Sequence, residues 1–458
     1  MKNAVLMSRL LASVLITMIV FWAQSAAHAA PADSPPASPS PSVQDSEGQP
    51  DNDYVLARHY AAGTDGVIQD LGKAFELYQK AAERGYVPAI FEVAEMYFQG
   101  LGVPQDTAKA VEVYNKAAQL GSFEAQVTLG RLYFNGHTVA RNKAEAVKYF
   151  RGPAELGHLE AQLVLGVTYH TGDGVPQDKA EGFSWFLKAA EQGSPGAQFN
   201  VGVSYANGEG VAADKAKAVE WYQKSAEQGY IPAQINLAFA YAQGSGIKAD
   251  KSEAAKWFQK AAEQGNSGGQ FNLAMMYYEG DGVVQDKAAA AGWFEKAAEQ
   301  GNVAAQFNLA NMLQNGDGVP VETGVAADWL EKAAEAGMAE AQFNLALMYH
   351  NGIGRLKDPK ATVLWFEKAA EQGMASAQLN LGVMLFQGNG VPKDEAEAVR
   401  WFEKAAEQGS VEAQYNLGDC YLSGNGVAKD EAAAARWFEK AAEQGSLEAA
   451  EALKELKN

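Results

Sequence analysis

Two helical patterns alternate along this chain. The stretch AQLNLGVMLFQG (377–388) places apolar residues at helical spacing and ends on Gly388, a residue that readily takes the left-handed conformation that stops a helix. After a short connection, Asp394 precedes the second pattern, EAEAVRWFEKAAEQ (395–408), as a capping residue. Glu397, three residues after Asp394, completes an acidic capping box. The pattern therefore predicts a helical hairpin.

The hairpin recurs with a strict period of 36 residues. The period is marked by glycines at positions 85, 121, 157, 193, 229, 265, 301, 337, 373, 409 and 445. A fixed period of this length is typical of a stacked array and not of separate globular domains.

Each hairpin has apolar positions that it cannot bury alone, so it must stack on its neighbours. The position two residues after the shared Gln-x-Asn is always small, which allows the helices to approach closely. It is filled by Gly166, Gly202, Ala238, Ala274, Ala310, Ala346, Gly382 and Gly418. The final segment, SLEAAEALKELKN, begins another first helix but replaces apolar positions with charged residues, as a capping helix does. We expect an all-α, α/α superhelical solenoid of about eleven hairpins plus this capping helix, spanning residues 51–458.

The consensus sequence of the repeat resembles the Sel-1-like repeat family, a relative of the tetratricopeptide repeat. It reads A-Q-x-N-L-G-x-M-Y-x-x-G-x-G-V-x-x-D followed by A-x-x-W-F-x-K-A-A-E-Q-G. The resemblance covers about residues 52–458. It implies an adaptor or scaffold, and its exported bacterial members regulate signalling, envelope polysaccharide assembly and host interaction. A cysteine-rich branch is associated with β-lactam binding or cleavage. This chain lacks that branch's cysteine pair, so the resemblance does not extend to that activity.

The first residues predict export. Residues 1–29 combine a positive start, an apolar run and the small-x-small site Ala27-His28-Ala29, which is the pattern of a secretory signal peptide cleaved near Ala29. The alternative is a retained membrane anchor. Residues 30–50 are rich in proline and serine and predict a disordered linker. We expect a periplasmic or secreted protein without stable membrane insertion after cleavage.

The composition argues against several classes of function. The formal net charge is -19, and no cluster of Lys and Arg offers phosphate contacts, so we expect no nucleic-acid partner. The single cysteine, Cys420, allows no internal disulfide or cysteine-based metal site, and it takes a position filled by methionine in other repeats, which predicts a core residue. The G-x-S-x-G match at 265–269 joins two helices and lacks the strand that a nucleophile elbow needs. We predict no catalytic residue, metal or cofactor.

Two rows of amides recur at fixed repeat positions. The first row consists of Asn200, Asn236, Asn272, Asn308, Asn344, Asn380 and Asn416. The second consists of Gln126, Gln162, Gln198, Gln234, Gln270, Gln306, Gln342, Gln378 and Gln414. An amide donates and accepts hydrogen bonds, so the Asn row is a candidate floor for a peptide groove on the concave face. The alternative is that the Asn amides tie each hairpin to the preceding loop. The Gln row is interpreted as structural, with a role in stacking.

Two irregular places interrupt the array. Gly152-Pro153 stands inside a second helix, and the proline predicts a kink and a change of path near residues 138–155. The basic loop 354–359 is either a partner contact or a harmless variant.

These observations predict a non-enzymatic protein–protein interaction scaffold or adaptor of the cell envelope. It would bind a protein or an extended peptide on the concave face. Two alternatives remain open at this point. One is a periplasmic regulator of a membrane signalling protein, and the other is a weak hydrolase acting on β-lactams or envelope glycans.

Overall fold

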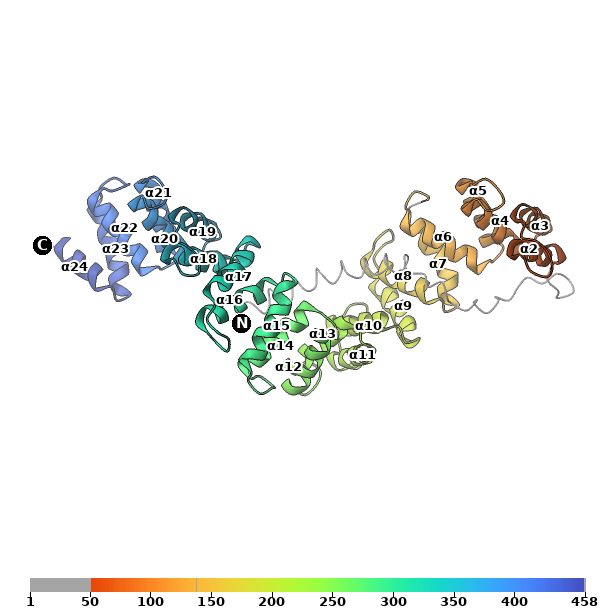
Figure 1. Ribbon diagram of the computed structural model, residues 1–458, viewed down its shortest axis with the longest axis horizontal. Coiled ribbons are helices and arrows are strands. Elements are labelled where there is room, and N and C mark those ends of the chain that lie inside the picture. The colour runs from red at the N-terminus through yellow and green to blue at the C-terminus, as the bar shows by residue number, and fades with distance from the viewer. Residues whose placement is uncertain (1–50, 137, 457–458) are drawn as a thin grey trace. The chain divides into compact units, whose positions relative to one another are not determined.

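The computed structural model describes residues 51–136 and 138–456, and these residues form helices joined by short loops, with no strand among them (Figure 1). The prediction of an all-α solenoid of paired helices plus a capping helix is confirmed. The predicted signal peptide (1–29) and linker (30–50) lie outside the described residues. Within the described part, no helix is both long enough and apolar enough to cross a bilayer.

The first helices of the hairpins are α2 (Asn52–Ala62), α4 (Val87–Gln99), α6 (Phe123–Asn135), α8 (Leu159–Thr171), α10 (Pro195–Asn207), α12 (Ile231–Gln243), α14 (Ser267–Glu279), α16 (Val303–Asn315), α18 (Ala339–Asn351), α20 (Ala375–Gln387) and α22 (Val411–Ser423), and α24 (Leu447–Leu456) follows as the capping helix. The second helices are α3 (Leu71–Glu83), α5 (Thr107–Gln119), α7 (Lys143–Glu155), α9 (Lys179–Glu191), α11 (Lys215–Glu227), α13 (Lys251–Glu263), α15 (Lys287–Glu299), α17 (Thr323–Glu335), α19 (Pro359–Glu371), α21 (Glu395–Glu407) and α23 (Glu431–Glu443).

The helices fall into two compact units. The first unit comprises the described residues up to Ala233 together with Ser245–Ile247. The second comprises Gln234–Gly244 and the described residues from Lys248 onward. In both units the helices that pack extensively are consecutive in the chain, as expected for a repeat array.

The second helices begin where the acidic caps predict. Asp394 has an extended backbone, and its side chain accepts a hydrogen bond from the backbone N–H of Glu397 at 2.9 Å, which satisfies a donor that the helix itself leaves free. Asp178 and Asp250 cap α9 and α13 in the same way. The backbone N–H of Asp394 also donates to the carbonyl of Leu385 in the preceding helix at 3.0 Å, which closes the hairpin.

Two loop glycines are required by the backbone. Gly388 ends α20 in the left-handed conformation, with φ of 72°. Gly390 has φ of 84°, and a Cβ there would lie 2.3 Å from the carbonyl oxygen of Pro359 at the start of the preceding hairpin's second helix. A side chain at position 390 would therefore push consecutive hairpins apart.

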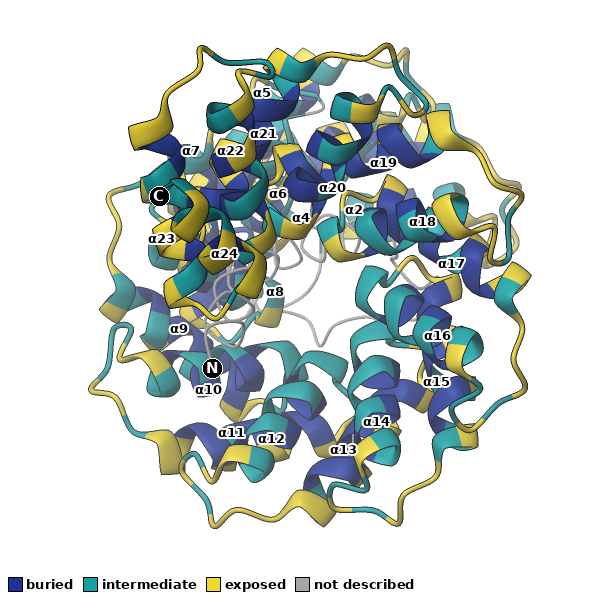
Figure 2. Ribbon diagram, turned by 90° about the vertical axis from the view of Figure 1, so that its left-hand side faces the viewer, coloured by how far each residue is buried: buried dark blue, intermediate teal, exposed yellow. Residues whose placement is uncertain are grey.

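Where the small position on a first helix is glycine, it faces an aromatic ring on its partner helix, whereas the α16–α17 hairpin pairs Ala310 with Leu330. A Cβ at Gly382 would lie 2.6 Å from the ring of Phe402, and one at Gly418 would lie 2.7 Å from the ring of Phe438. Phe402 and Phe438 are buried, with exposed fractions of 3% and 1%. Burial of a Phe side chain contributes about 1.5–3 kcal/mol, so this contact is a main source of stability in each hairpin. Figure 2 shows such buried positions where neighbouring helices face each other.

In the second unit, the first helices α14, α16 and α18 lie on the inner side of the curve, and the second helices α15, α17 and α19 lie on the outer side (Figure 2). We call the surface that consecutive first helices form together the first-helix face. It carries the residues that sequence analysis selected as a groove.

The two irregular places have local explanations. Helix α7 spans thirteen residues, like its counterparts, and holds the buried Pro153 within it, so the proline does not break the helix. In the basic loop, the Arg355 guanidinium donates to the carboxylates of Asp328 and Glu331 and to the carbonyl of Gly324. Arg355 therefore ties the loop to α17.

Candidate functional site

The predicted Asn row lies on the first-helix face, one residue on each first helix from α10 to α22. All seven side chains are half-buried. In three of them the amide nitrogen donates to the carbonyl four residues earlier in the same helix: Asn272 to Gly268, Asn308 to Ala304 and Asn380 to Ser376, at 2.7–2.8 Å. These bonds stay within one helix and do not reach a preceding loop.

The bond within the helix fixes the orientation of the amide. A carbonyl can accept only from the NH₂ end, so Nδ2 is turned toward the helix and one of its two N–H groups is used. In the described residues, no hydrogen bond of the protein uses Oδ1 of Asn272, Asn308 or Asn380. Both lone pairs of each Oδ1 remain available to a ligand.

The Gln row has a structural role, and its geometry shows how it connects hairpins. Gln162 in α8 donates from Nε2 to the carbonyl of Ala154 in α7 at 2.9 Å. Its Oε1 accepts from Nε2 of Gln192, the residue that caps the end of α9, at 2.6 Å. One buried side chain therefore joins three successive helices. The same pair of bonds recurs at Gln198, Gln270, Gln342, Gln378 and Gln414.

Gln306 breaks this rule. Its Nε2 donates to the carbonyl of Ala298 at 3.1 Å, but the residue thirty positions later is Ala336 instead of glutamine. Its Oε1 is buried without a hydrogen-bond partner. The link between α16 and α17 therefore lacks one bond that the neighbouring hairpins have.

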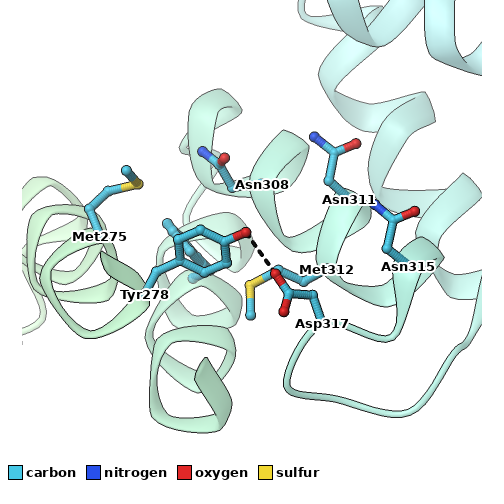
Figure 3. A pocket seen from close by; sticks show the side chains of 8 residues that line it. Met275, Tyr278, Asn308, Asn311, Met312, Asn315 and Asp317 are labelled. Carbon is cyan, nitrogen blue, oxygen red and sulfur yellow. Dashed lines mark hydrogen bonds between the residues drawn. The ribbon is translucent and has the colours of Figure 1, made fainter. Parts of the chain in front are cut away.

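Two adjoining hollows open on the first-helix face of the second unit. The first, of about 140 Å³, is lined by residues from α14, α15 and α16 and by the loop that follows α16 (Figure 3). The second, of about 230 Å³, is lined by α16, α18 and the loop after α18. Asn311 and Asn315 line both hollows, so the two form one groove across consecutive repeats. We call it the α14–α18 groove.

The α14–α18 groove is rich in amides. The structure brings Asn308 and Asn344 of the predicted row to it, together with four amides that sequence reasoning missed: Asn311, Gln314, Asn315 and Asn351. Asn311 was missed because its repeat position is Met275 and Leu347 in the adjacent repeats. A local feature of the sequence could have identified Asn311, because the segment 308–315 holds four amides in eight residues.

Tyr278 and Asp317 line the first hollow and form a hydrogen-bonded triad with Lys287. Tyr278 donates from its hydroxyl to Oδ2 of Asp317 at 2.7 Å (Figure 3). Lys287 donates to Oδ1 of Asp317 at 2.5 Å. The Lys287 ammonium and the Tyr278 hydroxyl lower the pKa of Asp317, and the bond to Asp317 raises the pKa of Tyr278. Asp317 is therefore held as a carboxylate.

The first unit has the same arrangement three repeats earlier. His170 takes the place of Tyr278, and its Nε2 lies 3.4 Å from Oε2 of Glu209. Lys179 pairs with Glu209 at 2.8 Å. Burial lowers the pKa of His170, so near neutral pH it is an uncharged imidazole.

A model of the Sel1 repeat family matches eleven consecutive segments of this sequence. They are residues 53–86, 87–122, 123–158, 159–194, 195–230, 231–266, 267–302, 303–338, 339–374, 375–410 and 411–446. The chain belongs to the Sel1 repeat family.

Two solved Sel1-type structures are similar to this chain. One is c5321, a protective antigen present in uropathogenic Escherichia coli strains and displaying an SLR fold. It is 39% identical over 88% of this chain and 87% of its own, with a TM-score of 0.66. The other is a Sel1 repeat protein from Oxalobacter formigenes, 30% identical over 78% of this chain and 98% of its own, with a TM-score of 0.57. No curated protein matches the sequence significantly.

Sel1 repeat solenoids are generally interaction scaffolds without catalytic activity, and this chain has their architecture. In this Sel1 chain, Ser267 of the G-x-S-x-G match begins α14, and Asn266 before it caps that helix. Cys420 is a buried core residue, as predicted. In residues 51–136 and 138–456, no three His, Cys, Asp or Glu side chains converge as metal ligands would.

Proposed function

We propose that this Sel1 repeat protein is a non-enzymatic scaffold of the cell envelope that binds a protein partner, through an extended segment, on its first-helix face. The observation that carries the proposal is the α14–α18 groove, in which six amide side chains from α16 and α18 line two adjoining hollows.

Amides suit the backbone of an extended peptide. A peptide presents an N–H and a carbonyl at each residue, and an amide side chain can pair with either group whatever the peptide's sequence. Asn308 and Asn344 occupy one position in consecutive repeats, so the same contact can be repeated along the strand. This is how a repeat array gains affinity from many modest bonds.

Apolar side chains form the base of the groove. Met312 and Met348 come from the same position of α16 and α18, and each is buried, with exposed fractions of 3% and 2%. Met275 lies at the edge of the first hollow (Figure 3). Methionine is flexible and polarizable, so such a base can adapt to different side chains of the bound segment.

The proposal places the protein outside the cytoplasm. Its support is the signal-peptide pattern of residues 1–29. A role as a regulator of a membrane signalling protein is one form of the same function, because it would use the same face. A hydrolase is not proposed: Tyr278 lies beside the Asp317 carboxylate in the groove, but its bond to Asp317 raises the pKa of its hydroxyl and so disfavours the phenolate that a nucleophile needs.

Site-directed crosslinking in the native compartment tests the proposal. A photo-crosslinking amino acid is placed at Asn315 or Asn351, which line the groove and are exposed, and in matched proteins at Gln223 or Gln259, exposed amides on the second helices α11 and α13. We expect a protein partner to be captured from the groove positions and not from the second-helix positions.

A triple variant provides the second measurement. Asn272, Asn308 and Asn344 are changed to Ala, and Gln223→Ala with Gln259→Ala is the control. Like Asn272 and Asn308, these two glutamines each donate a hydrogen bond from the side-chain amide to a group in their own helix. Loss of capture in the triple variant alone, with an unchanged far-UV spectrum, supports the proposal. Crosslinks that form equally from both faces would contradict it.

A further inference from the structure

Charge is segregated between the two kinds of helix in the second unit. The first helices α14, α16, α18, α20 and α22 contain no Lys or Arg, and they carry four acidic residues: Glu279, Glu340, Glu412 and Asp419. The second helices carry the lysines, for example Lys296 of α15, which lies 4.0 Å from the centre of the Trp293 ring. These five helices therefore bring no Lys or Arg to the first-helix face, and the ammonium that reaches Asp317 is that of Lys287 in α15.

Three amides of the same face, Asn272, Asn308 and Asn380, present more acceptor sites than donors. Asn272, Asn308 and Asn380 each use one N–H on their own helix and keep both lone pairs of Oδ1. Asp317 accepts from Tyr278 and Lys287, and a carboxylate has about four sites at which it can accept. A ligand with many hydrogen-bond donors can pair with these free acceptor sites, whereas a ligand with many carboxylates cannot.

The first hollow suits the side chain of lysine or arginine. Its wall includes Met275, Phe294 and Met312, which can cover an aliphatic stem, and its rim holds the Asp317 carboxylate (Figure 3). Its volume is about 140 Å³. A cavity of about 150 Å³ is known to be large enough for a benzene-sized molecule. The guanidinium or ammonium end would then reach the carboxylate and the amide oxygens of Asn308, Asn311 and Asn315.

We infer that the α14–α18 groove selects a basic, extended peptide and takes an arginine or lysine side chain into its first hollow, against Asp317. This inference rests on the proposed function and adds the chemistry of the partner. The charge of the whole chain, -19, also attracts a basic segment from a distance, but attraction of that kind does not choose a site. The experiment must therefore separate the groove from the general charge.

Fluorescence anisotropy with three labelled peptides provides the separation. The peptides are short and alternate Ser with Arg, Gln or Glu, and the protein is the chain without its predicted signal peptide. We expect the Arg peptide to bind about tenfold more tightly than the Gln peptide and the Glu peptide to bind least. The advantage of the Arg peptide should shrink as salt is added.

Two groove variants and one matched control locate the binding. Asn311→Lys puts a positive charge into the groove, and Asp317→Asn removes the carboxylate while keeping the side chain's shape. Gly292→Lys adds the same single charge on the exposed side of α15, where a Cβ meets no atom within 4 Å. The two groove variants should weaken the Arg peptide about tenfold, and Gly292→Lys should leave it nearly unchanged.

Three outcomes would overturn the inference. Equal weakening by Gly292→Lys would mean diffuse attraction to an acidic protein. Equal binding of the three peptides, all weakened by Asn311→Lys, would mean that the groove binds peptides without preferring basic ones. That result would leave the proposed function standing. If none of the three peptides bound, the preference for basic peptides would be refuted. The proposed function would still be tested separately by crosslinking at Asn315.

Discussion

A single side chain shows how strongly one residue can change the link between repeats. Gln306 keeps its donor bond but has a buried Oε1 without a partner, because Ala336 stands where other hairpins have the bridging glutamine. A buried acceptor without a donor costs about 1–3 kcal/mol. We predict that Ala336→Gln restores the bond and stabilises this part of the array by about 1 kcal/mol. Hydrogen exchange of the α16–α18 amides measures the change directly.

The neighbouring repeat supplies the matched control for Ala336→Gln. Gln372 donates to Gln342 Oε1 at 2.8 Å, so Gln372→Ala creates the defect that Gln306 has naturally and should reduce protection by a similar amount. The interpretation of the bridge would be wrong if Ala336→Gln left the exchange rates of α16–α18 unchanged.

The reactivity of the Cys420 thiol should depend on whether the protein is folded. Burial, together with the nearby carboxylates of Asp419 and Glu395, raises the pKa of the Cys420 thiol from about 9 to about 12. At pH 8 the folded protein should therefore react with iodoacetamide about a thousandfold more slowly than the unfolded chain, because the thiolate is the reacting form. A raised folded-state pKa contributes stability below pH 9 that is lost as the pH rises above that value. Alkylation followed by mass spectrometry would contradict this if the two rates were similar.

Recurrence decided which residues could be identified from the sequence. The Gln row repeats without change, and its structural role was predicted, but its glutamine partners lie thirty residues away and only the packed helices reveal them. Asn311 lines the groove because of where α16 lies, and no periodic pattern marks it. Asn351 has a periodic signal that sequence analysis missed, because amides recur at its repeat position, for example Gln243, Asn315 and Gln387. The contact of the repeated lysine with tryptophan also appears only in the structure, where Lys404 lies 3.7 Å from the centre of the Trp401 ring.

At the scale of the element, helix boundaries follow local chemistry and were predictable. Apolar spacing, Asp caps and glycine stops identified α20 and α21 to within two residues. Pro153 is the exception, because its effect depends on the neighbours of α7. The ring is buried between helices, and α7 keeps its full length around it. Packing therefore holds together a helix that its local sequence disfavours.

The cost of that proline can be measured. Pro153→Ala would restore a backbone N–H that can donate to the carbonyl of Tyr149, four residues earlier. A proline inside a helix costs about 3 kcal/mol, so the variant should stabilise α7 by about 1–3 kcal/mol after the loss of some ring packing. Hydrogen exchange of the α7 amides should slow accordingly. Faster exchange would show that the packing of the ring outweighs the missing hydrogen bond.

At the scale of the whole molecule, stability is expected to be local. The helices that pack extensively are consecutive in the chain, so a defect in one hairpin has no direct route to a distant one. In such arrays the free energy is approximately a sum of repeat terms and nearest-neighbour terms. The midpoint of a global unfolding curve would therefore not show which repeats a substitution destabilises. Measurements that report on each helix separately are needed.

Phe438→Ala tests this locality. Phe438 is 1% exposed and packs with Ala434, Ala441 and Ala449 between the last hairpin and α24. Its loss should cost about 3–5 kcal/mol and release α22–α24 to rapid exchange, while α4–α9 of the first unit keep their protection. Phe150→Ala, at the corresponding buried position of α7, should do the reverse and expose α6–α8 while α20–α24 stay protected. Loss of protection along the whole chain in either variant would mean that the array unfolds as one cooperative body, and binding in the α14–α18 groove would then depend on every repeat instead of its own three.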